Sequence, residues 1–157
     1  MGINPPSLYA AFGNKESLFL KVLERYAKGP ASYVMKALLA PTAREVAEQR
    51  LYGAVDMMCD SSHPLGCLAV QASAKCGDAR GSMGKKLIAF CNGSHQAFVD
   101  RFKRAKAEGD LPNGADPNAL ARYVSTIAQG ISMQAASGVS RTELQGVVKM
   151  ALKQWPS

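Results

Sequence analysis

Residues 1–19 read MGINPPSLYAAFGNKESLF. Asn4 is a good N-cap residue, and Pro5 suits the first position of a helix, where no backbone N–H is needed. Gly13 favours the end of that helix, and Asn14 can cap a second helix directly after it. The stretch therefore predicts two helices that meet at a tight turn.

The first of these helices has an apolar side and a polar side. Leu8 and Phe12 lie four residues apart, so they share one face and can pack together against a core. Ser7, Tyr9 and Lys15 are then left facing outward. Hydroxyl donors and a cation near a helix start are suited to phosphate oxygens, so we expect these three side chains to contact a nucleic-acid backbone.

This segment resembles the end of the helix-turn-helix of the TetR family of transcriptional regulators, which reads Gly-Val-Ser-x-x-Ser-Leu-Tyr-x-x-Phe-x-x-Lys-Glu-x-Leu. The matching positions are Gly2, Ile3, Asn4, Ser7, Leu8, Tyr9, Phe12, Lys15, Glu16 and Leu18. Asn4 replaces a serine and keeps the capping function, whereas Ala11 replaces a frequent histidine and removes one backbone contact. The resemblance implies the following DNA-binding residues: Asn4, Pro5, Pro6, Ser7, Tyr9 and Lys15. Among them, Pro5 or Pro6 would contact a base.

The same resemblance implies that about two helices precede this segment in family members and hold the recognition helix in place. Because this chain starts at Gly2 inside the turn, we expect it to lack those first helices. A shortened protein, a misplaced start codon or residues left out of the sequence would each explain this. Leu8 and Phe12 would then lose their packing partners, and the segment would dock weakly or fray.

The composition indicates a helical, globular chain. It has 157 residues, of which 47% are hydrophobic and 20% charged, with few aromatic residues and a net charge of +7. A basic balance suits a nucleic-acid partner, although Lys and Arg also solvate helix faces. One basic group lies near the expected reading segment: Lys15, Lys21, Arg25 and Lys28. A second group is interpreted as a solvated helix end: Arg101, Lys103, Arg104 and Lys106.

No stretch of the sequence has the length of a membrane span or the character of a secretory signal, so we expect a cytoplasmic protein without a membrane partner. The cysteines are Cys59, Cys67, Cys76 and Cys91. They lack the paired spacing of a zinc ribbon, and disulfides are uncommon in the cytosol. Most of them are expected to be buried thiols, and no cofactor is predicted.

Turn and capping signals divide the chain into helices without any sheet. The expected helical ranges are 15–28, 31–40, 42–59, 67–76, 80–106, 116–137 and 140–155. Gly93 and Ser94 could mark a kink or a close backbone approach within the long fifth range. The predicted fold is all-α, and the resemblance implies a TetR-type bundle. Residues 1–28 would form a partial DNA-binding region, and residues 29–157 would form a ligand-binding and dimerisation domain.

The last two predicted helices carry apolar stripes that can pair with a second copy about a two-fold axis, giving a four-helix bundle. Family resemblance points to the same surface. The expected interface residues are Tyr123, Ile127, Ile131, Leu144, Val148, Ala151, Leu152 and Trp155. The alternative is that both stripes face only the core of their own chain.

The function implied by the resemblance is that of a DNA-binding regulator, most simply a repressor, controlled by an unidentified small-molecule effector. Effector pockets are mostly apolar cavities with a few polar groups. The candidate lining residues are Met57, Met58, Cys67, Val70, Gln71, Phe90, Ser94, Phe98, Gln129 and Met133. Each of these side chains could equally fill the core.

Two other classes of function compete with the regulator. Catalysis is not expected, because the sequence lacks paired metal-binding histidine motifs and a phosphate-binding glycine loop. A metal or thiol-redox sensor that does not bind DNA is the alternative to the regulator. Cys59, His63 and Cys67 are spaced four apart and would share a face on one helix. Pro64 and Gly66 interrupt that helix, however, so no metal site is predicted.

Overall fold

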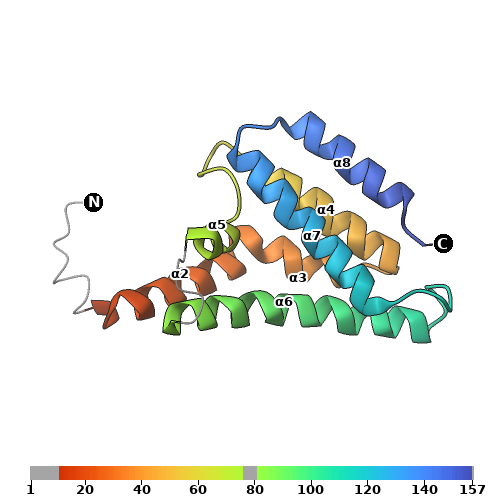
Figure 1. Cartoon of the computed structure of the whole chain (residues 1–157), viewed down its shortest axis with the longest axis horizontal. Helices are drawn as coiled ribbons and strands as arrows, with labels where there is room; N and C mark the ends of the chain where they lie inside the picture. The colour runs from red at the N-terminus through yellow and green to blue at the C-terminus, as the bar shows by residue number, and fades with distance from the viewer. Residues whose placement is uncertain (1–10, 76–80, 157) are drawn as a thin grey trace. The chain divides into compact units, whose positions relative to one another are not determined.

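The computed structural model describes residues 11–75 and 81–156, and every regular element in these ranges is a helix (Figure 1). The elements are α2 (Lys15–Lys28), η1 (Pro30–Ser32), α3 (Tyr33–Ala37), α4 (Ala43–Met58), α5 (Leu68–Lys75), α6 (Ser82–Ala107), α7 (Pro117–Ala136) and α8 (Arg141–Lys153). The predicted all-α class is therefore confirmed. Within these ranges, no helix combines the length and the apolar character that crossing a bilayer requires.

The chain divides into two compact units between Ser32 and Tyr33. The division falls a few residues after the predicted boundary at residue 28. The smaller unit contains α2 and η1, and the larger one contains α3 to α8.

The start of α2 follows from the local sequence. Gly13 has a φ of +86°, a conformation that glycine adopts without strain. The Asn14 side chain then accepts a hydrogen bond from the Ser17 N–H at 2.8 Å, which caps the helix. At the other end, the helix stops at Gly29. Both predicted ends of this helix are confirmed.

The core of the larger unit is built around α4 and α7. Helix α7 packs against α4, α5, α6 and α8, and α4 also contacts α3 and α8 (Figure 1). The largest fully buried side chains of this unit come from four helices, α4, α6, α7 and α8: Leu51, Val46, Val55, Met58, Leu87, Val99, Phe102, Val124, Ile131, Leu144 and Val148. Apolar residues spaced three and four apart thus bury one face of each helix.

Two of these helices begin with the predicted capping boxes. Thr42 and Glu45 form one before α4, and Ser140 and Glu143 form the other before α8. In each box the hydroxyl of the cap residue accepts a hydrogen bond from the backbone N–H of the glutamate. The glutamate carboxylate in turn accepts one from the backbone N–H of the cap residue. Asp116 caps the start of α7, where the sequence predicted a capping carboxylate.

The Ser140→Ala substitution is expected to lower the free energy of unfolding by about 1 kcal/mol, because the Glu143 N–H loses its acceptor at the start of α8. Thr142→Ala is the matched control, since Thr142 is exposed in the same turn and has no capping role. Urea denaturation of both variants measures the difference. Equal losses would show that the cap contributes nothing specific.

The predicted helix over 31–40 is broken and shorter than expected. It consists of η1 and α3, and α3 ends at Ala37. The carbonyl groups just beyond the end of α3 accept hydrogen bonds from Arg101 of α6. Its guanidinium donates to the carbonyl oxygens of Leu38 at 3.3 Å and of Ala40 and Pro41 at 2.9 Å each. The interpretation of Arg101 as part of a solvated cationic cluster was therefore wrong, because this side chain is buried.

Helix α6 continues through Gly93 and Ser94 without an interruption. Apart from the backbone of α6 around it, no atom of the described residues lies within 4 Å of a Cβ placed at Gly93. The predicted close backbone approach at this glycine is therefore absent.

Candidate functional site

Most of the predicted DNA-contacting residues lie outside the described residues: Asn4, Pro5, Pro6, Ser7 and Tyr9. Lys15 is described, and it is the exposed first residue of α2. A lysine at this position stands at the turn between the two N-terminal helices predicted from the sequence.

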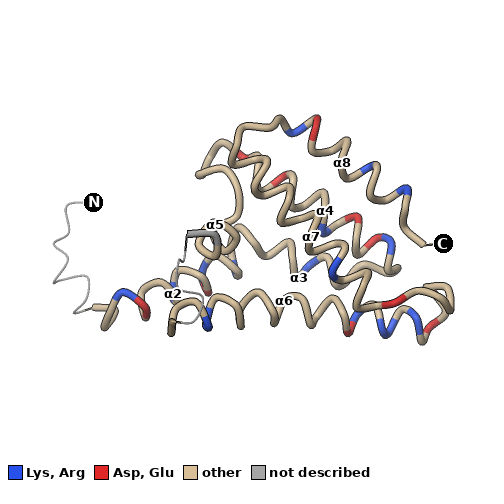
Figure 2. The backbone as a smooth tube through the Cα atoms, in the orientation of Figure 1, with Lys and Arg blue, Asp and Glu red and all other residues tan. Residues whose placement is uncertain are grey.

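The exposed side of α2 carries further basic residues (Figure 2). Lys21 lies over the ring of Phe12, with its Nζ 5.2 Å from the ring centroid. Lys28, at the far end of the helix, pairs with Glu24 at 2.6 Å. The pairing lowers the pKa of the Glu24 carboxyl through a hydrogen bond and the charge of Lys28.

The predicted effector-binding residues separate into three groups. Met57, Met58 and Phe98 are buried core residues. Five others are half-buried: Cys67, Val70, Gln71, Phe90 and Ser94. The last two, Gln129 and Met133, are exposed on α7, and their contact with an effector stays a prediction. Gln71 donates to the Leu65 carbonyl at 2.7 Å, so it holds the preceding loop.

A polar pair that sequence reasoning missed lies where α3 meets α4. Arg50 Nη1 donates to the Tyr33 hydroxyl at 3.0 Å, and its guanidinium lies 5.3 Å from the ring centroid. The ring packs directly on Gly53, where an added Cβ would come within 2.5 Å of it. Burial, the largest cause, raises the pKa of the Tyr33 hydroxyl, and nearby Cys67 raises it further while Arg50 opposes this. Only the small residue at position 53 hinted at this packing.

Two hydrogen bonds from backbone N–H groups fix the end of the loop between α4 and α5. The Gly66 N–H donates to the Met58 carbonyl at 3.1 Å, and the Cys67 N–H donates to the buried Ser132 hydroxyl of α7 at 2.8 Å. Gly66 has a φ of +89°, and a Cβ there would lie 3.0 Å from the Ser132 carbonyl oxygen. Glycine is thus required by both conformation and space. The loop is fixed to α7, and Cys67 has a defined position at the start of α5.

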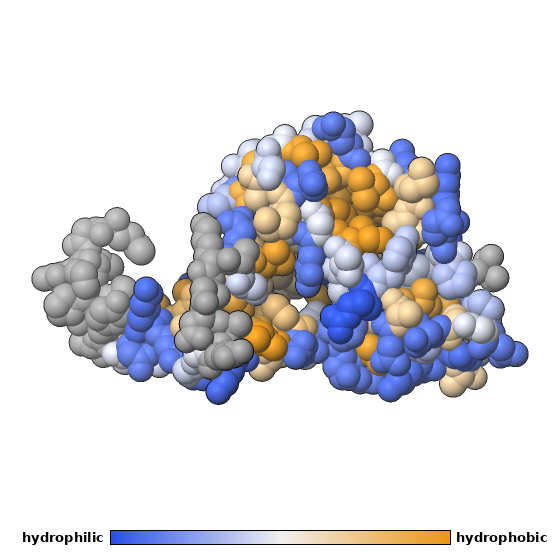
Figure 3. Space-filling model, viewed as in Figure 1, coloured by the Kyte–Doolittle hydropathy of each residue, from blue (hydrophilic) through white to orange (hydrophobic). Residues whose placement is uncertain are grey.

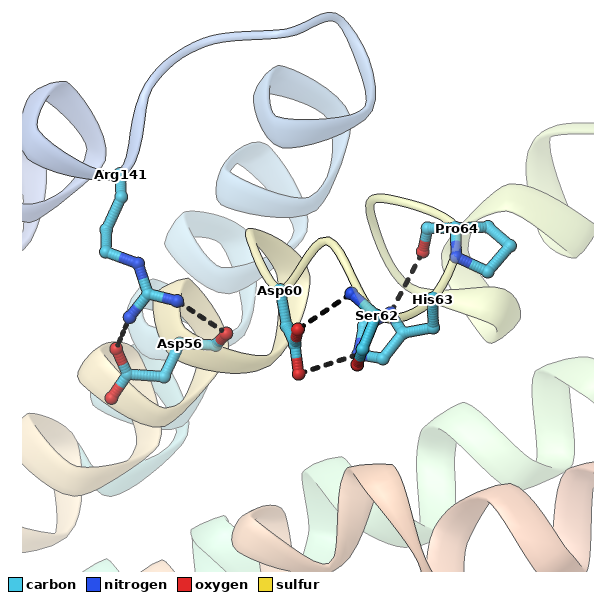
Figure 4. A network of polar contacts seen from close by, with 6 residues as sticks. All are labelled: Asp56, Asp60, Ser62, His63, Pro64 and Arg141. Carbon is cyan, nitrogen blue, oxygen red and sulfur yellow. Dashed lines mark hydrogen bonds and ion pairs between the residues drawn. The ribbon is translucent and has the colours of Figure 1, made fainter.

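Cys59, His63 and Cys67 do not form the common face that their spacing would give on one helix. Helix α4 ends at Met58, and the loop has contacts of its own (Figure 4): Asp60 accepts from the Ser62 N–H at 2.9 Å, and His63 Nδ1 lies 3.2 Å from the Pro64 carbonyl. Across residues 11–75 and 81–156, no three His, Cys, Asp or Glu side chains gather as metal ligands would.

Cys59 faces a different set of groups from Cys67. Arg141 at the start of α8 binds the Asp56 carboxylate at 2.5 Å and the Asp56 carbonyl at 3.3 Å (Figure 4). Burial, the largest cause, raises the pKa of the Cys59 thiol; Arg141 opposes this shift and Asp56 adds to it. Cys59 therefore lies beside the contact between α4 and α8.

Cys67 instead opens α5, which packs against α6, the helix that contains Cys91. Burial, the largest cause, raises the pKa of the Cys91 thiol; Cys67 raises this pKa further, and Ser73 of α5 opposes the shift. Both thiols are half-buried and free.

Six of the predicted interface residues lie in the core of their own chain: Ile131, Leu144, Val148, Ala151, Leu152 and Trp155. Tyr123 and Ile127 are half-buried, and the Tyr123 hydroxyl donates to the Ala151 carbonyl at 3.1 Å. For the six buried residues the alternative was correct, because the strongest apolar stripes are the faces that join α7 and α8 to the core.

Other residues form the outward surface of α7 and α8, where Figure 3 shows apolar groups near the surface. Met133 and Val147 are each 48% exposed and Met150 is 62% exposed. Gly130 and Gly146 are exposed as well, and within the described part of the chain only the backbone of their own helix lies near a Cβ placed on either one. This outer face is apolar and low in profile.

Comparison with known proteins agrees with the architecture. The family model described as "Tetracyclin repressor-like, C-terminal domain" matches residues 47–150. The HTH-type transcriptional repressor ComR of Escherichia coli (strain K12) is 26% identical over 157 residues, covering 99% of this chain and 75% of that protein. The HTH-type transcriptional repressor BdcR of the same organism is 69% identical over 26 residues, 17% of this chain and 13% of that protein.

A solved structure is similar over almost the whole chain. It holds a cysteine-substituted form of the TetR family transcriptional regulator CifR in complex with 26-base-pair operator DNA. The two structures superpose with a TM-score of 0.88 at 38% sequence identity, over 98% of this chain and 81% of that one. Fold, family model and sequence identity agree, so this chain belongs to the TetR family of transcriptional regulators.

Proposed function

We propose that this protein is a homodimeric transcriptional repressor that binds operator DNA and leaves it when a small-molecule effector binds the larger helical unit. In this proposal, residues 1–28 supply the DNA contacts and residues 29–157 bind the effector and the second copy. The observation that carries it is the likeness to CifR, whose structure was solved on its operator. A repressor that binds the genome acts in the cytoplasm.

The described part of the N-terminal unit supports the DNA-binding role. Lys15 is exposed at the first turn of α2, next to the capped turn that follows the predicted recognition helix. A cation at a helix start adds to the positive end of the helix dipole and favours a phosphate ligand. With Ser7 and Tyr9, it would fix the register of the helix on the DNA backbone.

Lys15→Ala is expected to weaken binding about equally for all DNA sequences. It should also reduce the salt dependence of the DNA affinity by the equivalent of about one phosphate contact. The assay is a titration of DNA from upstream of the protein's own gene, repeated at several salt concentrations. Lys28→Ala is the matched control, because Lys28 is exposed on the same helix and already paired with Glu24. If the wild-type protein binds this DNA no better than random DNA, the proposed function is wrong.

Dimerisation through the outer face of α7 and α8 is part of the proposal. Apolar side chains at Met133, Val147 and Met150 gain from burial, and glycines at positions 130 and 146 let two helices approach closely. The predicted four-helix bundle is thus retained, with a different face of each helix toward the partner.

Effector binding is proposed for the interior between α3, α4, α5 and α6. The half-buried residues there combine apolar walls, such as Val70 and Phe90, with the Tyr33 hydroxyl and the Arg50 guanidinium. A mostly apolar molecule with one hydrogen-bonding group suits this composition. The effector would change the spacing of the two DNA-binding segments of the dimer only if it binds one of the dimer's two conformations more tightly than the other.

A further inference from the structure

We propose that Arg50 and Tyr33 form a binding site for a carboxylate, the charged end of an otherwise apolar small molecule. The two side chains join α3 to α4 within the larger unit. Arg50 Nη1 donates to the Tyr33 hydroxyl at 3.0 Å, and the guanidinium carbon lies 5.3 Å from the ring centroid. Together these contacts fix a cation on the face of an aromatic ring.

The fixed guanidinium lacks a carboxylate partner. Among the described residues, Arg141 pairs with Asp56, whereas no ion pair includes Arg50. The other nitrogens of Arg50 are not sealed inside the protein either. In this part of the chain, the buried side-chain nitrogens and oxygens without a partner are His95 Nδ1 and Arg101 Nη1. Arg50 therefore keeps N–H donors that an incoming anion can reach.

The groups that this pair leaves free are mainly hydrogen-bond donors. The Tyr33 hydroxyl accepts from Arg50, so its own proton is available to a further acceptor, and a guanidinium has donors only. The complementary ligand group must accept several hydrogen bonds, and the positive charge favours an anion. A carboxylate matches two adjacent guanidinium N–H groups in geometry, and its single charge balances one cation, whereas a phosphate dianion would exceed it.

Gly53 makes room for the ring that supports Arg50. A Cβ at position 53 would lie 2.5 Å from Cδ2 and 3.1 Å from Cγ of Tyr33, so the ring could not keep its place. Glycine is unfavourable inside a helix, and its presence within α4 fits a requirement for this contact. The surrounding helix turn is apolar, with Ala54 and Met57 buried, so an apolar remainder suits the ligand.

The test is isothermal titration calorimetry of the full chain with sodium octanoate, without DNA. Octanoate should bind about tenfold or more tightly than acetate or 1-octanol, which lack the apolar tail and the charge respectively. Arg50→Gln should lower the octanoate affinity by about 10–100-fold, the usual range for a hydrogen bond to a charged group. Arg44→Gln is the matched control, because Arg44 of the same helix donates to the Leu152 carbonyl.

Two further variants test the site if circular dichroism shows that Arg50→Gln disturbs folding. Gly53→Ala retains both polar side chains but displaces the ring, so it should weaken octanoate binding while the helical signal is kept. Tyr33→Phe removes only the hydroxyl and should lower the affinity by about 3–10-fold.

The proposal is overturned if the wild-type chain does not bind octanoate, if it binds 1-octanol as tightly, or if octanoate binding survives Arg50→Gln. That this carboxylate acts as the effector rests on the proposed function, and it is measured separately by adding octanoate to the complex with operator DNA. Octanoate that binds the protein but leaves it on the DNA would refute the effector role alone. A chain that never binds operator DNA would refute the repressor role and leave the calorimetry unaffected.

Discussion

Phe102→Ala is expected to lower the free energy of unfolding by about 3–5 kcal/mol, the usual cost of removing a buried phenylalanine. Phe102 has no exposed surface, and its ring centroid lies 5.5 Å from that of Trp155 and 6.2 Å from that of Phe98. The substitution opens a cavity between α6 and the C-terminal segment after α8. Because domains are stable by only about 5–15 kcal/mol, much of the native stability would be lost.

Guanidinium denaturation followed by the fluorescence of Trp155, the only tryptophan, measures this loss at a fixed protein concentration. Ile88→Ala is the control, since Ile88 lies on the same helix and is 48% exposed. We expect its effect to be within about 0.5 kcal/mol, as for most surface positions. Similar losses in both variants would contradict the assignment of Phe102 to the core.

The fold could be predicted where local sequence determines local structure. The Asn14 cap, the two capping boxes and the Asp116 cap each depend on a side chain and a backbone group within a few residues, and each is confirmed. Helix periodicity likewise identified α7 and α8. Periodicity could not identify what each helix face packs against, because an apolar stripe has the same pattern whether it packs on its own chain or on a second copy.

The candidate sites depended on contacts between residues far apart in the chain. Arg101 lies in a basic stretch, and only the carbonyls of Leu38, Ala40 and Pro41 reveal why it is buried. The spacing of Cys59 and Cys67 suggested a pair, but α4 ends at Met58, and the Cys67 N–H donates to Ser132 of α7 at the start of the next helix. Neither result follows from spacing, since the approach of the loop to α7 is set by tertiary packing.

Gly146→Arg is expected to convert the proposed dimer to a monomer and to reduce operator affinity by about 10²–10⁴-fold, because two linked half-site contacts become one. Gly146 is exposed on α8 beside Val147, and no described residue outside this turn of the helix comes within 4 Å of an added Cβ. Within one chain the arginine is therefore tolerated, and replacing a helical glycine favours the helix by about 1 kcal/mol. In a close-packed interface, the same side chain would bury a charge without a partner.

Sedimentation velocity at several protein concentrations distinguishes the two states, and circular dichroism verifies that the helices are intact. Gly93→Arg is the matched control: it also replaces an exposed helical glycine with open space around it, but on α6. Gly130→Arg on α7 should behave like Gly146→Arg, since both glycines are placed in the same contact. A protein that stays dimeric with arginine at 130 and 146 would exclude this face as the interface. If only Gly93→Arg dissociates the dimer, the interface lies on α6 instead.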